Sequence, residues 1–203
     1  MLKRAAATQT LKATLKATSL VWRLGLVYLL CVFSLWFSPA HADQNDKSLE
    51  GYFEQLQNAS SNAETQAIQN QIWQAWLSAP DENSTYLMSQ LNRAMAAGQH
   101  QLALLLSNQL IDSTPKFAEA WNKRATVYYL LGDHKLSVAD IKETLVLEPR
   151  HFGALSGLGL IFMSAGQYEA ALDVFNKVLE ISPSSDNARG SVARAKSLIG
   201  DDI

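Results

Sequence analysis

Glycines and prolines recur along the chain at one fixed spacing. They stand at Gly98, Gly132, Gly166, Pro115, Pro149 and Pro183. A glycine at positive φ commonly ends one helix, and a proline ends the next because it cannot continue it. A fixed period of about 34 residues indicates repeated helical units that bury one another's open faces when stacked. The spacing defines three windows, 84–117, 118–151 and 152–185.

Apolar residues in the third window follow the periodicity of two helices. Leu155, Leu158 and Phe162 are separated by three and four residues, so they share one helix face. A second apolar stripe begins after Gly166 and stops at Pro183. Each window is therefore predicted to be an antiparallel helix pair, and the fold to be all-α.

The second and third windows resemble the tetratricopeptide repeat. The matching positions are Trp121, Ala125, Tyr128, Gly132, Ser137, Ile141, Leu145 and Pro149, followed by Leu155, Gly159, Phe162, Gly166, Ala171, Phe175, Leu179 and Pro183. The first window matches more weakly, because Leu91 stands where the family has a small residue. The resemblance implies a short right-handed α-solenoid of three repeat units plus capping helices, with a concave groove that binds protein segments.

Both flanks of the repeats are predicted to be helical caps. Residues 43–83 carry two apolar helical stripes separated by a turn-like NASSN segment, and residues 186–203 form a predicted capping helix and tail. Trp73 and Trp76 lie in the second stripe. We expect them to pack in the core, and a partner-binding surface is the alternative.

The N-terminal segment 1–42 is predicted to be a secretory signal peptide. It holds five basic residues and no acidic one, with an apolar run from Leu24 to Phe37 followed by Ala40-His41-Ala42. The run is shorter than the ~20 residues that span a bilayer. We expect cleavage between Ala42 and Asp43 and delivery to a bacterial periplasm. The alternatives are an uncleaved N-terminal anchor, through which alone the protein would contact the membrane, and an organelle transit peptide.

Charge and composition exclude several classes of function. All 19 acidic residues but 12 of the 17 basic ones follow residue 42, which gives that part a net charge near −7. Nucleic-acid binders need a basic stripe instead. Cys31, the single cysteine, lies in the predicted leader, and the sequence has no metal-ligand spacing, phosphate-binding glycine loop or Ser/His/Asp set. We expect no enzyme activity, cofactor or metal, and other proteins as partners.

Three glycines fall in one predicted helix, where each costs about 1 kcal/mol relative to alanine. Gly159 aligns with Ala125, where the two helices of a unit approach closely, and we expect alanine to serve nearly as well there. Gly153 and Gly157 share the face that lines the groove in the family. We hypothesise that they leave bare backbone for a partner segment. Packing of the C-terminal cap or the next helix onto this strip is the alternative.

The same register places further side chains on the concave face. The candidate partner-binding residues are Asn92, Met95, Asn122, Lys123, Thr126, Tyr129, Gly153, Ser156, Gly157 and Leu160. Met88 and Glu119 are expected on the same face. Asparagine offers a peptide backbone both a donor and an acceptor, and methionine adapts to irregular apolar surfaces.

One group of tetratricopeptide domains clamps the C-terminal carboxylate of heat-shock chaperones, and that ligand is not predicted here. Asn92 matches one clamp position. Met88, Lys123, Gly153 and Gly157 stand where the clamp has Lys, Asn, Lys and Arg. Four of the five positions therefore differ from the clamp, and we do not expect this ligand.

Three histidines follow the predicted leader. We expect His100 and His134 in solvated turns. Arg150 and His151 follow Pro149 at the start of a predicted helix. We expect this pair to be exposed to water, and an anion site at the helix N-terminus is the alternative.

These features predict a non-enzymatic adaptor or scaffold for protein–protein interaction in the bacterial cell envelope. It would bind a peptide segment or a partner helix in the concave groove. By resemblance to small bacterial tetratricopeptide proteins, plausible tasks are organising envelope complexes or assisting assembly of envelope or cytochrome proteins. The alternative is a self-associating structural envelope protein, which light scattering would detect as an oligomer.

Overall fold

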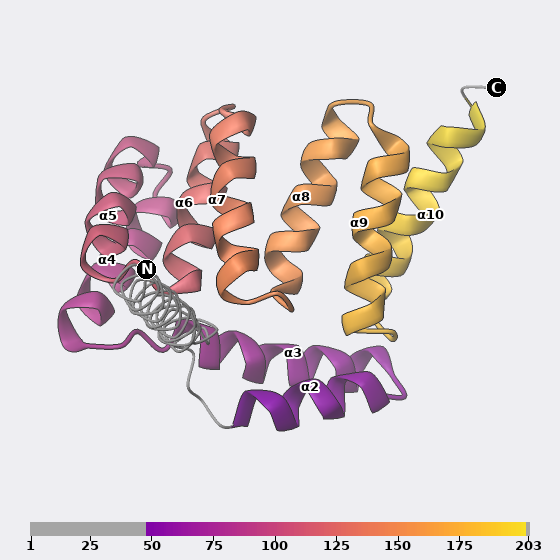
Figure 1. Ribbon diagram of the computed structural model, residues 1–203, viewed down its shortest axis with the longest axis horizontal. Coiled ribbons are helices and arrows are strands. Elements are labelled where there is room, and N and C mark those ends of the chain that lie inside the picture. The colour runs from indigo at the N-terminus through magenta and orange to yellow at the C-terminus, as the bar shows by residue number, and fades with distance from the viewer. Residues whose placement is uncertain (1–47, 202–203) are drawn as a thin grey trace, which may run out of the picture. The chain divides into compact units, whose positions relative to one another are not determined.

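The computed structural model describes residues 48–201, all of which belong to one compact unit (Figure 1). These residues form nine α-helices and no strand, which confirms the all-α prediction. None of these described helices is long and apolar enough to cross a membrane. The predicted leader, its cleavage site at Ala42 and Asp43, and the last two residues of the predicted tail lie outside the described residues.

The helices follow one another as antiparallel pairs (Figure 1). In chain order they are α2 (Ser48–Asn58), α3 (Asn62–Leu77), α4 (Glu82–Ala96), α5 (His100–Ser113), α6 (Ala118–Leu130), α7 (His134–Leu147), α8 (Phe152–Ser164), α9 (Tyr168–Ile181) and α10 (Asp186–Asp201). Each repeat window holds one pair: α4 with α5, α6 with α7, and α8 with α9.

The three repeat pairs turn at the regularly spaced glycines. Gly98, Gly132 and Gly166 have φ angles of 68°, 81° and 70°. No atom lies within 4 Å of a Cβ added at any of them, so backbone conformation, not space, requires glycine. The amide of Asp133 donates to the carbonyl of Tyr128 at 2.9 Å, which satisfies a free carbonyl at the end of α6.

An aspartate fixes the start of the first repeat helix. The Asp81 carboxylate accepts hydrogen bonds from the backbone N–H of Ser84 at 2.8 Å and from its hydroxyl at 2.9 Å. These bonds favour the ionised carboxylate and hold the pKa of Asp81 below its ordinary value. The cap satisfies one of the amides that α4 leaves free at its N-terminus.

Arg124 connects three repeat helices through hydrogen bonds. Arg124 on α6 donates to both carboxylate oxygens of Asp140 on α7, at 2.7 and 2.9 Å, and to Asn108 on α5 at 2.9 Å. The bonds to Asp140 raise the pKa of Arg124 above its ordinary value. The planar guanidinium suits this bidentate geometry and locks the first two repeat pairs together.

The small position in the third repeat pair is tighter than expected. A Cβ on Gly159 would lie 2.4 Å from Cε1 of Phe175. Real Cβ atoms essentially never come this close to another heavy atom. The expectation that alanine would serve at Gly159 is therefore wrong. In the second pair, Ala125 packs in a core with Ile141, the smaller counterpart of Phe175 in the repeat register.

Two larger cores and one small core hold the described helices together. The first joins α2 and α3 to α8, α9 and α10, and its fully buried members include Leu56, Ile72 and Trp76. The second joins α4, α5 and α6. The small core, made of Ala125, Ile141, Ala154 and Ile161, connects the two halves across α6, α7 and α8.

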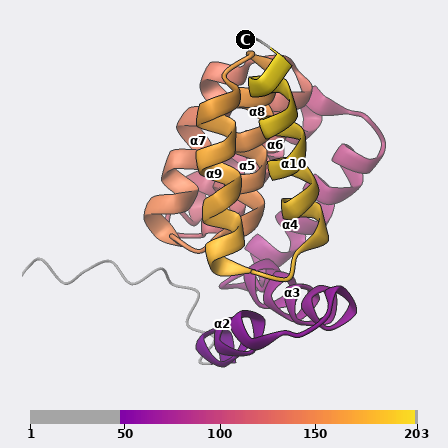
Figure 2. The same cartoon turned by 90° about the vertical axis from the view of Figure 1, so that its right-hand side faces the viewer.

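The N-terminal helices pack on the third repeat pair, although the first pair follows them in sequence. Figures 1 and 2 show α2 and α3 lying across the ends of α8 and α9. Gln57 donates to the carbonyl of Glu180 and, at 3.0 Å, to that of Ile181. The Ser184 hydroxyl donates to the carbonyl of Ala59 at 2.8 Å. The predicted N-terminal cap therefore joins distant parts of the chain.

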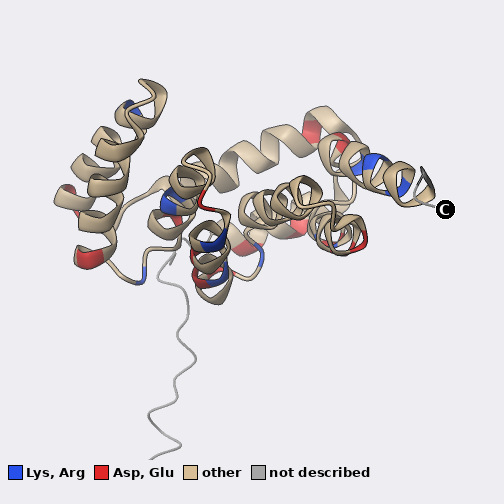
Figure 3. Ribbon diagram, turned by 90° about the horizontal axis from the view of Figure 1, so that it is seen from above, with Lys and Arg blue, Asp and Glu red and all other residues tan. Residues whose placement is uncertain are grey.

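The C-terminal helix α10 has one buried face and one exposed face. Ala195 is buried, whereas Arg189, Arg194 and Lys196 are exposed. Figure 3 shows positive and negative residues interspersed over the helices.

Candidate partner-binding groove

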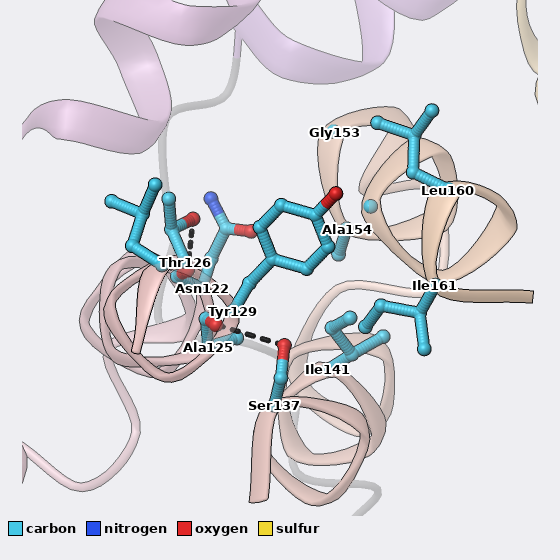
Figure 4. Close-up of a pocket in the computed structure, with 12 residues that line it drawn as sticks. Asn122, Ala125, Thr126, Tyr129, Ser137, Ile141, Gly153, Ala154, Leu160 and Ile161 are labelled. Carbon is cyan, nitrogen blue, oxygen red and sulfur yellow. Dashed lines mark hydrogen bonds between the residues drawn. The ribbon is translucent and has the colours of Figure 1, made fainter. Parts of the chain in front are cut away.

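A pocket of ≈290 Å³ lies between α6, α7 and α8 (Figure 4). It is lined by Asn122, Ala125, Thr126, Tyr129, Leu130, Ser137, Ile141, Gly153, Ala154, Gly157, Leu160 and Ile161. None of these side chains is charged, and most are apolar. At its rim Tyr129 and Leu160 remain 37% and 51% exposed, so large apolar groups face water there.

Six of the ten candidate residues line this pocket: Asn122, Thr126, Tyr129, Gly153, Gly157 and Leu160. The other four do not. Asn92 is exposed and Met95 half-buried on α4, outside the pocket. Lys123 pairs with Glu119 at 3.3 Å, and the Ser156 hydroxyl donates to the carbonyl of Phe152 at 2.7 Å. A contact of any of these ten residues with a partner stays a prediction.

The two groove glycines have different surroundings. A Cβ on Gly157 would meet one atom, Cδ1 of Ile141, at an ordinary 3.8 Å. A Cβ on Gly153 would lie 2.5 Å from the outer ring of Trp73. Bare backbone is thus open at Gly157 and covered at Gly153. The helix that covers Gly153 is α3. The alternative hypothesis from the sequence had the next helix or the C-terminal cap packing there.

The tryptophans of α3 pack inward. Trp76 is fully buried, as predicted, and Trp73 is partly buried against the same core. The two rings meet edge to face with centroids 5.3 Å apart. Aromatic pairs favour this geometry, and both rings also contact Phe152 at the N-terminal end of α8.

His151 is buried, so both sequence-based readings of it are wrong. Its side chain is fully buried, and Nδ1 accepts a hydrogen bond from the Ala154 amide at 3.0 Å, capping α8. Its Nε2 lies 3.0 Å from Oε2 of Glu119. Because Nδ1 accepts, Nε2 carries the proton and donates it to Glu119. His151 therefore contacts the carboxylate of Glu119 on α6, and not the water or the free anion that the sequence-based hypotheses expected.

Two expected groove residues belong to the interior. Glu119 is fully buried, and Met88 is 4% exposed in the core of the first repeat pair. The Oε2 atom of Glu119 accepts from His151 and from Nδ2 of Asn122, at 3.0 and 2.9 Å. Its Oε1 atom pairs with Lys123 at 3.3 Å, without hydrogen-bond geometry. The Lys123 ammonium and these two donors therefore compensate the buried carboxylate.

Arg150 is engaged by the N-terminal helices. Its Nη1 lies 2.8 Å from Oε2 of Glu50 on α2, and its guanidinium lies 4.0 Å from the ring centre of Phe53. A second pair joins it to Glu148 at 3.4 Å. Arg150 thus fastens α2 to the loop before α8 and is not free for an anion.

Neither His100 nor His134 belongs to a candidate site. His134 is exposed, as predicted, with its ring 5.3 Å from that of Tyr129. The prediction of a solvated turn is wrong for His100, which is partly buried as the first residue of α5. Across residues 48–201, no group of three or more His, Cys, Asp or Glu side chains is placed to hold a metal ion.

A second hollow of ≈720 Å³ continues past the rim residue Leu160. It lies between α8, α9 and α10 and shares Leu160 with the pocket. Leu160 is the one lining residue of this hollow among the sequence-based candidates, and Asn187, Ser191 and Arg194 are among those that the sequence analysis missed. They stand one full repeat period after Gly153, Gly157 and Leu160, so extending the repeat register by one helix would have found them.

Comparison with known proteins agrees with this architecture. Two tetratricopeptide repeat family profiles match residues 89–143 and 153–185. A TPR repeat-containing protein of Rhizobium etli is 31% identical over 144 residues, which is 71% of this chain and 71% of the relative.

Solved structures show the same fold. The Sgt2 TPR domain of Aspergillus fumigatus has a TM-score of 0.56 and 27% identity, covering 61% of this chain and 83% of that domain. The first TPR of Spaghetti (RPAP3), bound to an HSP90 peptide, has a TM-score of 0.55 and 19% identity, covering 58% and 93%. The family matches, the Rhizobium relative and the stacked helix pairs together show that this chain belongs to the tetratricopeptide repeat family.

Proposed function

We propose that this protein is a non-enzymatic adaptor of the bacterial cell envelope that binds an extended segment of another protein across α6 and α8. The observation that carries the proposal is the uncharged pocket beside Gly157, whose backbone is open. A missing side chain lets a partner backbone approach the helix closely, and the pocket beside it accepts an apolar side chain. This combination fits an extended peptide of low charge.

The partner is not an acidic chaperone tail. The first TPR of Spaghetti binds an HSP90 peptide, and such a ligand requires cationic groove residues. Here Lys123 is paired with the buried Glu119, and Gly153 and Gly157 carry no side chain. The groove therefore supports a partner recognised by shape and apolar contact.

Site-specific photocrosslinking in the source cells tests this function. A photoreactive benzoylphenylalanine at Leu160, on the pocket rim, should give a crosslinked partner. The same residue at Glu143, exposed on α7 outside the pocket, should not. Mass spectrometry of the adduct identifies the partner.

Filling the pocket provides the matched control. Gly157→Leu should abolish the adduct at position 160, because its Cβ would meet only Cδ1 of Ile141, at 3.8 Å, and the rest of its side chain would extend into the pocket. Gly51→Leu makes the same change on α2, where no atom lies within 4 Å of the added Cβ. This control should leave the adduct intact. An adduct that survives Gly157→Leu in a folded protein would show that the partner binds elsewhere.

The envelope location is part of the proposal and is tested separately. The basic, apolar leader and its Ala40-His41-Ala42 motif support export. The intact mass of the purified protein should equal that of a chain beginning at Asp43. The protein should also be released with the periplasmic fraction. A mass that includes residues 1–42, together with retention in the membrane fraction, would favour the uncleaved anchor.

A further inference from the structure

The pocket holds one polar group whose orientation is fixed by buried neighbours. Asn122 is 8% exposed and lines the pocket with its amide. Its Nδ2 donates to Oε2 of Glu119 at 2.9 Å. Because a carboxylate accepts and cannot donate, the amide nitrogen must face Glu119 and the amide oxygen must face the other way.

The amide oxygen is available to a ligand. Among the hydrogen bonds of the described residues, none uses Oδ1 of Asn122. Figure 4 shows this oxygen on the side of Tyr129 and the nitrogen turned away from that ring. The pocket therefore presents a hydrogen-bond acceptor to its occupant.

A chain of buried contacts holds Asn122 in this orientation. Glu119 accepts from His151 through the same oxygen that binds Asn122, at 3.0 Å. His151 is fixed at both ring nitrogens and stacks on Trp76 with centroids 4.1 Å apart. Glu119, His151 and Trp76 are all fully buried, so reversing the amide would cost Glu119 one of its donors and would place two oxygens together.

The rest of the pocket is apolar and uncharged. Apart from Asn122, Thr126, Ser137 and Tyr129, the lining consists of carbon side chains and glycine backbone. The Thr126 hydroxyl donates to the carbonyl of Asn122 at 3.0 Å, and that of Ser137 donates to the carbonyl of Ala125 at 2.8 Å. A charged side chain would lose its hydration here and find no ion partner.

From these contacts we infer that the pocket binds the indole of a tryptophan in the partner segment. Indole has a large apolar body and one N–H, which donates and does not accept. The indole body fits within the ≈290 Å³ space, and its N–H would donate to Oδ1 of Asn122. Asn122 is thus the specificity residue, and Glu119 and His151 position it. This inference rests on the proposed groove and adds the chemistry of its occupant.

Two matched compounds test the donor. N-acetyl-L-tryptophanamide carries the indole N–H, and the amide of N-acetyl-3-benzothienylalanine has sulfur in its place with nearly the same size. Each is titrated into the isotope-labelled protein purified from cells expressing the full chain, and the backbone amide signals of Gly157 and Ala154 are followed by NMR. We expect both signals to shift, with affinity about three- to tenfold higher for the indole.

Two variants complete the test. Asn122→Ala should reduce this preference to less than twofold, while Asn58→Ala, the same substitution at the exposed end of α2 outside the pocket, should leave it unchanged. Circular dichroism checks that both variants fold. Equal affinities of the two compounds for the wild-type protein, shifts confined to residues outside the pocket, or a preference that survives Asn122→Ala would each overturn the inference. If crosslinking at Leu160 still yields a partner in that case, the groove function stands and the indole assignment alone fails.

Discussion

The imidazole of His151 lies flat on the indole of Trp76, with ring centroids 4.1 Å apart and planes 9° apart. This stack joins α3 to the start of α8, although α4, α5, α6 and α7 lie between them in the sequence. The same imidazole caps α8 and donates to Glu119 on α6. One side chain thus connects three helices beside the pocket.

Removing this side chain should be costly. His151→Ala deletes the cap of α8, leaves the buried Glu119 short of a donor and opens a cavity beside Trp76. We expect unfolding free energy to fall by about 3–5 kcal/mol, measured by urea denaturation. His134→Ala, at an exposed position, should change it by less than about 0.5 kcal/mol. A loss below about 1 kcal/mol for His151→Ala would show that the network adds less than a typical hydrogen bond and cavity together.

The contact between Gly153 and Trp73 can be measured by a double-mutant cycle. Gly153→Ala should destabilise the protein by about 1–3 kcal/mol, because the new Cβ would lie 2.5 Å from the outer ring of Trp73. Trp73→Phe removes that outer ring. In its background, Gly153→Ala should be neutral or stabilising, since alanine favours the helix. Additive effects in urea unfolding would contradict the contact.

Two glycines in helices should respond oppositely to the same substitution. Gly159→Ala would place a Cβ 2.4 Å from Phe175 and should cost about 1–3 kcal/mol. Gly190→Ala, in α10, meets no atom within 4 Å and should gain about 0.5–1 kcal/mol from helix propensity. Thermal unfolding followed by circular dichroism compares them. A neutral Gly159→Ala would imply that the ring of Phe175 moves away without cost.

Stability should fall in acid partly through Asp81. Its pKa is lower in the folded chain than its ordinary value, because the ionised carboxylate accepts from Ser84. Folding therefore favours the deprotonated form, and this contribution is present above the ordinary pKa and lost as pH falls through the lowered one. The Asp81→Asn variant keeps an oxygen that can cap α4, but its amide does not ionise. The urea midpoint of this variant should therefore decline less than that of the wild-type protein as the pH falls through this range. Equal declines of the urea midpoint in the variant and the wild-type protein would show that Asp81 does not contribute to the loss of stability in acid.

Local patterns in the sequence were sufficient for the repeats. The turn glycines, such as Gly132, could be predicted because a positive φ depends on the residue itself and its neighbours. Leu155, Leu158 and Phe162 of α8 were placed on one face by helical periodicity, and all three pack in the first core. The same register placed Gly157 and Leu160 on one face, and the structure brings both to the pocket.

Tertiary structure decided what packs against those faces. The sequence could not show that Trp73 covers Gly153, that Glu119 is buried against His151, or that α2 fastens to α9, because these partners are far apart along the chain. Helical periodicity depends on neighbours three and four residues away, whereas long-range contacts depend on how whole helices fit. The sequence therefore determined the repeated helix pairs, and packing between them decided which glycine is covered and which acceptor faces the pocket.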